Sequence, residues 1–589
     1  MNIQARILRR LRRLYGDEAT SVSRRLRQLV DAHLRQVGND TRTRTWDERD
    51  AVLITYGNSI EASGQRPLQV LKAFVDRYLQ GAVNTIHVLP FFPYSSDDGF
   101  SVIDYREVDE ALGDWEDIHA LHEHFDLMVD LVLNHCSRSS LWFSNYIADV
   151  PPYNGYFVEA SPDDDLTRVF RPRSTPLLWK IRTHRGNRYV WGTFSDDQMD
   201  LNYRNPDVLL EMLDLLLFYV RAGTRIVRLD AVAYLWKQVG TNCIHRPETH
   251  ELVKLFRDVL RMASPNTLLL TETNFPYREN RGYFGQMETG PDGRAQADEA
   301  QIIYRFGLPP LLLHALHTGN TAYLCAWARA MEAEPPPPGC TYLNLTASHD
   351  GVGLRGLEGL VPEKEIDELI QAMHRRGGFV SMHCGKEGRE TPYEFNISYF
   401  DAFRDPDLEE DPWVTPCFLV SQLTAMSLQG IPALYIHSFT ATPNDYYGVE
   451  QTGRTRSINR RRWDWETLKA LLDNPETEQS RIFRALTHAL EVRKRHPAFH
   501  PDSPQRVLDL GPRLFGLERS TVDGSEQVFC LFNFTPNTRQ IAVDRTAWGS
   551  AGEIDQQYRD LLSGESPKIA RGRIHLPGYC ALWLKREAA

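Results

Sequence analysis

From about residue 50, short apolar segments alternate with amphipathic segments along most of the chain. The apolar segments have the length of buried strands, whereas segments between them, such as 67–79 and 206–222, repeat their apolar residues at helical spacing. Eight such units are typical of a closed parallel barrel with its chemistry at the carboxyl ends of the strands. We therefore predict an α/β fold, a (β/α)₈ TIM barrel. The predicted strands are 52–56, 85–89, 127–133, 226–230, 267–272, 302–306, 342–346 and 433–436.

The predicted strands are unevenly spaced. About 90 residues separate the third strand from the fourth, and another long segment follows the seventh. Both segments would rise over the carboxyl ends of the strands and form pocket walls. From about residue 505, short β-rich runs separated by Gly and Asp indicate a small all-β domain. The predicted organisation is an N-terminal helical extension (1–48), a catalytic barrel (49–136 and 201–504), an inserted lobe (137–200), a second insertion (351–411) and a C-terminal β domain (505–589).

The composition argues against several classes of protein. Lys and Arg number 67 and Asp and Glu 78, so the formal net charge is −11, which argues against general nucleic-acid binding. The longest apolar stretch, 208–220, is interrupted by Glu211 and Asp214, so we expect no membrane passage. The eight cysteines form no CxxC pair and no zinc-ligand spacing. We therefore expect reduced thiols, a cytoplasmic protein and no metal site.

The N-terminal segment combines basic and apolar residues at helical spacing, and no apolar core of a signal peptide follows it. We expect a surface helix whose basic face is solvated; the alternatives are a targeting segment or a nucleic-acid contact. The same helix could be a dimer contact, which leaves a homodimer open. The basic residues concerned are Arg6, Arg9, Arg10, Arg12 and Arg13.

Four of the predicted strands end in polar residues that strand packing does not require. Any one of them could be a helix cap or a satisfied core histidine. Four at the same topological position point instead to one pocket, because barrel strands converge there. The segments are Asp130-Leu-Val-Leu-Asn134-His135, Arg228-Leu-Asp230-Ala-Val, Thr271-Glu272-Thr-Asn274 and Ala347-Ser-His349-Asp350.

Several carboxylates, an arginine and two histidines in one polar pocket suit glycosyl transfer. An oxocarbenium-like transition state needs a carboxylate beneath the anomeric carbon and a protonated acid at the departing oxygen, roles that suit Asp230 and Glu272. Arg228 lies on the same strand face as Asp230 and is expected to keep it ionised and aimed. Burial beside other carboxylates is expected to raise the pKa of Glu272. Three further residues could bind sugar hydroxyls: His135, His349 and Asp350.

The motifs DLVLNH, RLDAV and SHD, with the strand-end Glu272 between the last two, resemble the conserved regions of the α-amylase family, glycoside hydrolase family 13. The resemblance covers about residues 50 to 585. It implies Asp230 as nucleophile, Glu272 as general acid/base and Asp350 as transition-state stabiliser. Double displacement with retention of the α-configuration would follow, and no cofactor is implied.

Within this family, VLITYGNSI, LPFFPYSSDDGFSVIDYREVD, RLDAVAYLWKQVGTNCIH and GRTRSINRR are similar to the sucrose phosphorylase group. These enzymes pass glucose from a small α-glucoside to inorganic phosphate, which is a co-substrate and attacks the intermediate on the nucleophile. The resemblance implies that Asp97 and Phe100 lie against the glucosyl unit and that Arg460 helps to hold it.

One position departs from the sucrose phosphorylases, which usually carry a histidine two residues after the acid/base where this chain has Asn274. Together with the N-terminal extension, the segments FRPRS and TETN most closely resemble the glucosylglycerate phosphorylase branch. This resemblance implies reversible conversion of α-glucosylglycerate and phosphate to α-D-glucose 1-phosphate and D-glycerate.

An anionic acceptor would be repelled by the carboxylates of such a pocket unless guanidinium groups held it. Arg171 and Arg173, in the predicted lobe, suit that role, and the alternative is a surface salt-bridge pair. We also predict substrate contacts for Tyr393, in the second insertion, and for Tyr234, which could equally be a core residue.

Several other functions stay open. The donor could be sucrose, sucrose 6′-phosphate or glucosylglycerol, or water could replace phosphate, as in an α-glucosidase or transglucosidase. A remote alternative is a non-catalytic sugar-binding module, which would be expected to have damaged catalytic carboxylates. The predicted partners are a small α-glucoside and phosphate.

Overall fold

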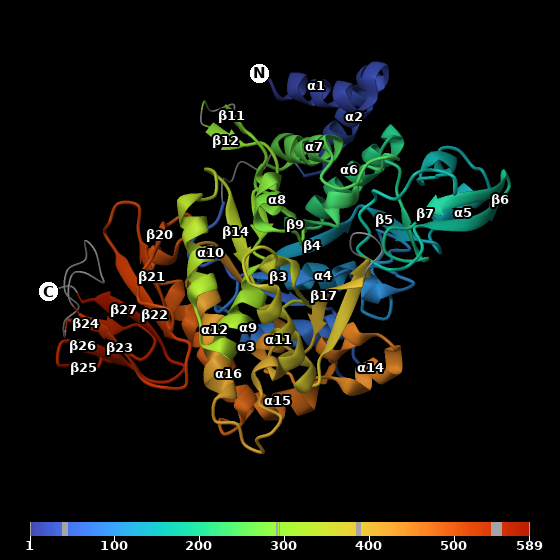
Figure 1. The fold of residues 1–589 in the computed structure, drawn as a ribbon. Helices are drawn as coiled ribbons and strands as arrows, with labels where there is room; N and C mark the ends of the chain where they lie inside the picture. The colour runs from blue at the N-terminus through green and yellow to red at the C-terminus, as the bar shows by residue number, and fades with distance from the viewer. Residues whose placement is uncertain are drawn as a thin grey trace.

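The computed structural model describes residues 2–37, 45–289, 293, 295–384, 390–543 and 557–587. Its centre is a closed barrel of parallel strands in the order β1-β18-β14-β13-β10-β9-β4-β3 (Figure 1). Every predicted barrel strand is present, so the predicted (β/α)₈ fold is confirmed. The strands are β1 (Val52–Thr55), β3 (Thr85–Val88), β4 (Asp126–Val132), β9 (Thr224–Asp230), β10 (Leu268–Thr271), β13 (Ile302–Tyr304), β14 (Thr341–Asn344) and β18 (Ile431–Tyr435).

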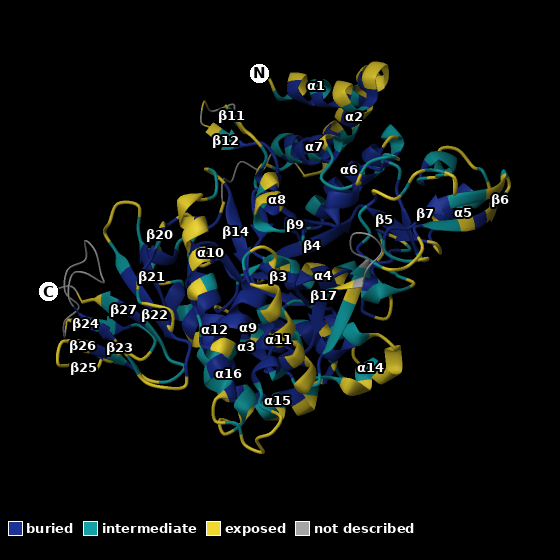
Figure 2. Cartoon of the chain, viewed as in Figure 1, coloured by how far each residue is buried: buried dark blue, intermediate teal, exposed yellow. Residues whose placement is uncertain are grey.

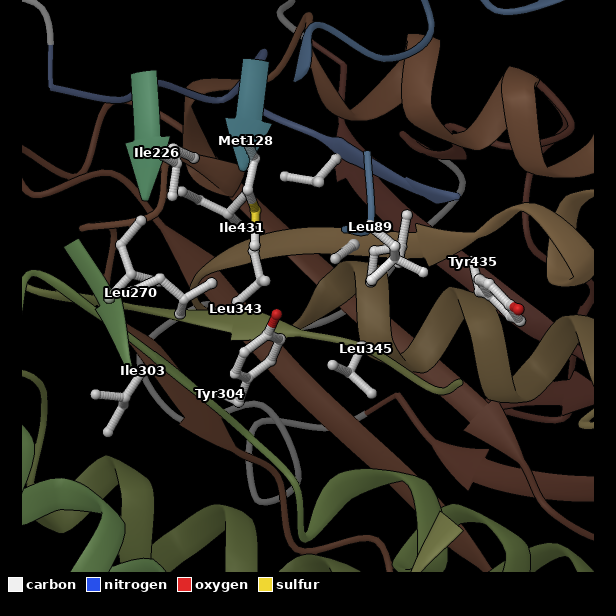
Figure 3. Close-up of a cluster of buried hydrophobic side chains, with 14 of the residues drawn as sticks. Leu89, Met128, Ile226, Leu270, Ile303, Tyr304, Leu343, Leu345, Ile431 and Tyr435 are labelled. Atoms are coloured by element: carbon white, nitrogen blue, oxygen red, sulfur yellow. The ribbon is translucent and has the colours of Figure 1, made fainter. Parts of the chain in front are cut away.

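The interior of the barrel is filled with side chains. Met128, Ile226, Leu270 and Ile431 belong to one buried cluster and are at most 1% exposed (Figure 3). Figure 2 shows β4, β9 and β14 buried, whereas exposed residues gather on outer helices such as α10 (Ala322–Ala333). Because side chains fill the barrel, a ligand cannot bind inside it, and we look for the ligand site at the ends of the strands.

Three of the outer helices begin with a proline. Proline occupies the first turn of α3 (Pro67–Tyr78), α6 (Pro206–Arg221) and α7 (Pro247–Ala263), where its missing N–H costs nothing. Among the described helices, none is long and apolar enough to cross a bilayer. The other outer helices include α4 (Trp115–His122), α9 (Leu308–Thr318), α12 (Val414–Ser427), α15 (Trp465–Asp473) and α16 (Glu478–Arg493).

The predicted insertions and terminal domain contain separate secondary structure. Residues 137–200 hold α5 (Leu141–Ile147), β6 (Leu178–Thr183), β7 (Gly186–Trp191) and β8 (Gln198–Asp200). Residues 351–411 hold β15 (Val352–Gly353), α11 (Glu363–Arg375), β16 (Phe379–Cys384) and β17 (Glu390–Asn396). From β20 (Gln505–Val507) to β27 (Ala581–Arg586) the elements are strands in two antiparallel sheets. The domain limits themselves remain our proposal.

Two helices, α1 (Ile3–Tyr15) and α2 (Ala19–Val37), pack over α7 and α6 (Figure 1). The prediction of a solvated basic face is wrong for Arg6 and Arg10, which are 4% and 1% exposed. Arg6 Nη2 lies 2.6 Å and Arg10 Nε 2.9 Å from the Asp258 carboxylate on α7. The two arginines are buried because they pair with acidic side chains that α1 covers. Arg12 is exposed, as predicted.

We expect Arg10→Ala to lower the free energy of unfolding by about 3 kcal/mol, because it leaves the buried carboxylates of Asp258 and Asp298 undercompensated. Urea unfolding followed by tryptophan fluorescence measures this change. The matched control is Arg12→Ala, at an exposed position of the same helix, where no measurable loss is expected. Equal losses in both variants would contradict the assignment of a stabilising role to the buried ion pairs.

The seven cysteines whose side chains are described are free, which agrees with the predicted thiols. The side chain of Cys384 lies outside the described residues.

Candidate active site

One cavity lies at the carboxyl ends of the barrel strands, between the inserted lobe and the second insertion. The structure therefore brings together residues that are far apart in the sequence. Except for Arg171 and Arg460, all of the predicted site residues line this cavity: Asp97, Phe100, His135, Arg173, Arg228, Asp230, Tyr234, Glu272, Asn274, His349, Asp350 and Tyr393.

Asp230 is the last residue of β9 and is held by Arg228 from the same strand. Arg228 Nη1 lies 2.8 Å from Asp230 Oδ1 and also pairs with Asp130 of β4. The next residue, Ala231, has a left-handed backbone with φ 50°, which turns the chain sharply at the strand end. Its N–H donates to Glu272 Oε2 at 3.0 Å, so the turn also places the second carboxyl group.

The two carboxyl groups influence each other's protonation. Burial raises the pKa of Glu272, which agrees with the prediction; Arg228 opposes the rise, and Asp350 adds to it. Burial also raises the pKa of Asp230, and Arg228 only partly offsets this effect. Arg228 therefore donates a hydrogen bond to Asp230, as predicted, but it does not bring the pKa of Asp230 below the ordinary value. We place the shared proton on Glu272, because Asp230 accepts the guanidinium hydrogen bond.

The pKa of the third carboxyl group, Asp350, is lowered, whereas those of Asp230 and Glu272 are raised. Burial raises its pKa, but His349 and Arg456 more than compensate and hold it below the ordinary value. Arg456 Nη1 lies 2.7 Å from Asp350 Oδ1. Arg456 in turn donates through Nε and Nη2 to the two oxygens of Glu394, at 2.7 and 2.8 Å. Asp350 is therefore an ionised carboxylate with a fixed orientation.

A ring stack forms another part of the wall. Phe100 and His349 are parallel within 8°, with centroids 4.8 Å apart. Burial lowers the pKa of His349 to about 3, so this ring is neutral at physiological pH. His135 places Nε2 2.9 Å from the Phe100 carbonyl oxygen, to which the ring N–H donates, and burial lowers its pKa as well. The stack offers a flat, uncharged face to a sugar ring.

Behind His135, an ammonium group bridges the barrel and the inserted lobe. Lys237 Nζ lies 2.6 Å from Asn134 Oδ1 and 2.6 Å from the Asp200 carboxylate, and all three residues are buried. Asp200 also accepts a bond from the Thr193 N–H at 3.0 Å. Within the described ranges, no group of three or more His, Cys, Asp or Glu residues is arranged to hold a metal ion.

Two predicted residues lie away from the cavity. Arg171 donates to carbonyl oxygens of its own loop, at Ser174 and Thr175. Arg460 donates through Nε to the His349 carbonyl at 2.9 Å, pairs with Asp98 and lines a neighbouring cavity. The arginine of this segment that reaches the candidate site is Arg456. A 3₁₀ turn over Thr455–Asn459 separates the directions of these two side chains.

Sequence reasoning missed four polar residues of the cavity: Gln198, Thr273, Glu394 and Arg456. Gln198 Nε2 lies 3.2 Å from Asp97 Oδ2, and Glu394 and Arg456 form the ion pair described above. Glu394 follows Tyr393, and Arg456 stands in the quoted GRTRSINRR motif, so both lay beside recognised positions. No local signal distinguishes them from their neighbours.

One positively charged lining residue of the cavity, Arg173, has no ion-pair partner among the described residues. Its guanidinium carbon lies 5.6 Å from the Tyr393 ring centroid. Nearby, the Oδ1 atom of Asn274 is buried and accepts no hydrogen bond from the described residues. Arg173 and Asn274 line the same cavity as Glu272.

Residues 77–313 match the family model described as alpha amylase, catalytic domain. The chain is 42% identical over 543 residues to a glucosylglycerate phosphorylase from Spirochaeta thermophila, a match that covers 91% of this chain and 90% of that protein. It is also 42% identical to a glucosylglycerate phosphorylase from Allomeiothermus silvanus, over 91% of this chain and 93% of that protein.

Among solved structures, the crystal structure of sucrose 6F-phosphate phosphorylase from Thermoanaerobacter thermosaccharolyticum is similar, with a TM-score of 0.70 and 23% identity. The match covers 85% of this chain and 95% of that chain. At this identity the likeness concerns the fold.

Proposed function

This chain belongs to the α-amylase family, in the group of the glucosylglycerate phosphorylases, and from this membership we propose that it is a retaining glycoside phosphorylase. The proposed reaction is the reversible conversion of α-glucosylglycerate and inorganic phosphate to α-D-glucose 1-phosphate and D-glycerate. The observation that carries the proposal is the identity to named glucosylglycerate phosphorylases over nine tenths of the chain, at 42%.

In the first step, Asp230 attacks the anomeric carbon and the bond to the glycerate oxygen breaks. Glu272, whose pKa is raised by burial, gives its proton to that departing oxygen. Asp350, ionised beside Arg456, stabilises the positive charge that develops on the sugar ring. The product is a covalent glucosyl ester of Asp230 and free glycerate.

In the second step, an oxygen of inorganic phosphate attacks the same anomeric carbon. Glu272 takes a proton from the incoming phosphate, the ester bond breaks and the Asp230 carboxylate is released. Two inversions leave the α-configuration unchanged. The glucosyl unit is proposed to lie against the Phe100 and His349 stack, with Asp97 and His135 at its hydroxyls.

The leaving group is proposed to lie beside Arg173. Arg173 has no carboxylate partner among the described residues and would bind the glycerate carboxylate. Asn274 Oδ1, buried without a partner, would accept a hydrogen bond from a glycerate hydroxyl.

The test is a donor screen with the purified protein. Glucosylglycerate, sucrose, sucrose 6′-phosphate and glucosylglycerol are each incubated with and without phosphate, and glucose 1-phosphate and free glucose are measured. We expect glucose 1-phosphate from glucosylglycerate and much less from the other donors. Free glucose released at an equal rate without phosphate would reject phosphorolysis, and a preference for another donor would reject glycerate as the leaving group.

A further inference from the structure

Arg355 is a largely buried arginine that does not line the cavity but contacts a ring that does. Its guanidinium carbon is 4.6 Å from the ring centroid of Phe275, which lines the cavity, and 5.0 Å from that of Phe170. The side chain is 13% exposed, and its Nη1 is buried without a hydrogen-bond partner among the described residues. The guanidinium group thus lies beside two aromatic rings, Phe170 and Phe275, whose centroids are 5.6 Å apart.

The charge of Arg355 is poorly neutralised within the chain. Glu358 Oε1 lies 3.4 Å from Arg355 Nε, but the Glu358 side chain is 53% exposed, so solvent screens this pair. A buried cation without a buried counter-charge is unfavourable unless another group compensates it. A bound anion would supply that compensation.

Arg173 is a second positive charge that we consider together with Arg355, and it lines the cavity directly. Arg173 lies over the Tyr393 ring and Arg355 over the Phe170 ring. The His383 ring lies between these two rings, 5.7 Å from Tyr393 and 6.3 Å from Phe170. Phe170, which touches Arg355, also packs 6.3 Å from the Tyr234 ring. Arg173 and Arg355 therefore approach one side of the cavity from different segments, the inserted lobe and the second insertion.

We propose that Arg355 is a specificity-determining residue for the acceptor, and that it selects an acid over an uncharged polyol. This inference rests on the proposed function. Arg173 would contact the acceptor carboxylate directly, while Arg355 would supply a fixed positive charge through the Phe275 wall, where low polarity strengthens its attraction. Arg171, which the sequence suggested as the partner of Arg173, bonds its own loop.

The test uses Arg355→Met, which keeps the length of the side chain but removes its charge, and Arg355→Lys, which keeps the charge. Glucose 1-phosphate is the donor, and transfer to D-glycerate is compared with transfer to glycerol. We expect Arg355→Met to lower kcat/KM for glycerate about ten- to hundredfold, mainly through KM, and to change that for glycerol less than about threefold. Arg355→Lys should recover part of the glycerate activity.

Arg375→Met is the matched control, because Arg375 is exposed on α11 in the same insertion. Hydrolysis of glucose 1-phosphate without acceptor reports whether the donor half of the site is intact in each variant. Equal losses with glycerate and glycerol, or no loss in Arg355→Met, would overturn the inference. If the wild-type protein forms no glucose 1-phosphate from any donor, the proposed function itself fails, which is a distinguishable outcome.

Discussion

Asp230→Asn is expected to abolish glucosyl transfer, lowering kcat on the order of 10⁴-fold or more. An amide of the same shape cannot form the ester that links the two steps. The fold should survive, because Arg228 keeps its ion pair with Asp130. Release of glucose 1-phosphate from glucosylglycerate and phosphate measures the effect. Mass spectrometry should find no glucosylated protein in the variant.

The matched control for this variant is Asp163→Asn, at an exposed position of the inserted lobe, where activity should equal that of the wild type. Near-normal turnover by Asp230→Asn would show that another group is the nucleophile. Loss of activity accompanied by unfolding in thermal melting would not count as support.

Glu272→Gln is expected to lower phosphorolysis of glucosylglycerate about 10²- to 10⁴-fold, because the departing glycerate oxygen no longer receives a proton. The loss should be smaller with α-glucosyl fluoride, whose leaving group needs no proton. Initial rates with both donors measure this difference. A similar loss with the two donors would contradict a role as general acid.

The pH dependence gives a second readout for Glu272. A general acid works while it is protonated, so wild-type activity should fall as the pH rises through the raised pKa of this group. Glutamine does not ionise, so the residual activity of Glu272→Gln should lack that alkaline fall. Glu450→Gln, at an exposed position of α14 (Tyr446–Thr452), is the control and should keep the wild-type profile.

The sequence was sufficient for the barrel and for the acids at its rim. Apolar runs and helical repeats are local patterns, and eight of them in alternation leave few alternatives to a closed parallel barrel. Asp230 ends β9, Glu272 directly follows β10, and Asp350 lies in the loop after β14, so a correct strand assignment places each of them at the cavity. The prediction needed no knowledge of the loops.

Loop conformation decided the residues that sequence reasoning misplaced. Arg456 and Arg460 stand four positions apart in one arginine-rich segment. A 3₁₀ turn contains Arg456 and ends before Arg460, and the first side chain pairs with Asp350 whereas the second pairs with Asp98. Arg171 was predicted together with Arg173 to hold an anionic acceptor, but its side chain donates to carbonyl oxygens of its own loop. Nothing in their local sequence distinguishes the two outcomes.

What the sequence by itself determined is therefore the barrel, the family and the acids at the ends of its strands. Strand and helix periodicity and the short family motifs are all patterns among neighbouring residues, so they can be recognised without the tertiary structure. What only the tertiary structure decided are the partners of the charges. Arg10 meets Asp258, and Arg456 meets Glu394, across long separations in the chain. Such pairs depend on how distant segments pack and on which charges burial leaves without water, and local sequence patterns do not contain that information.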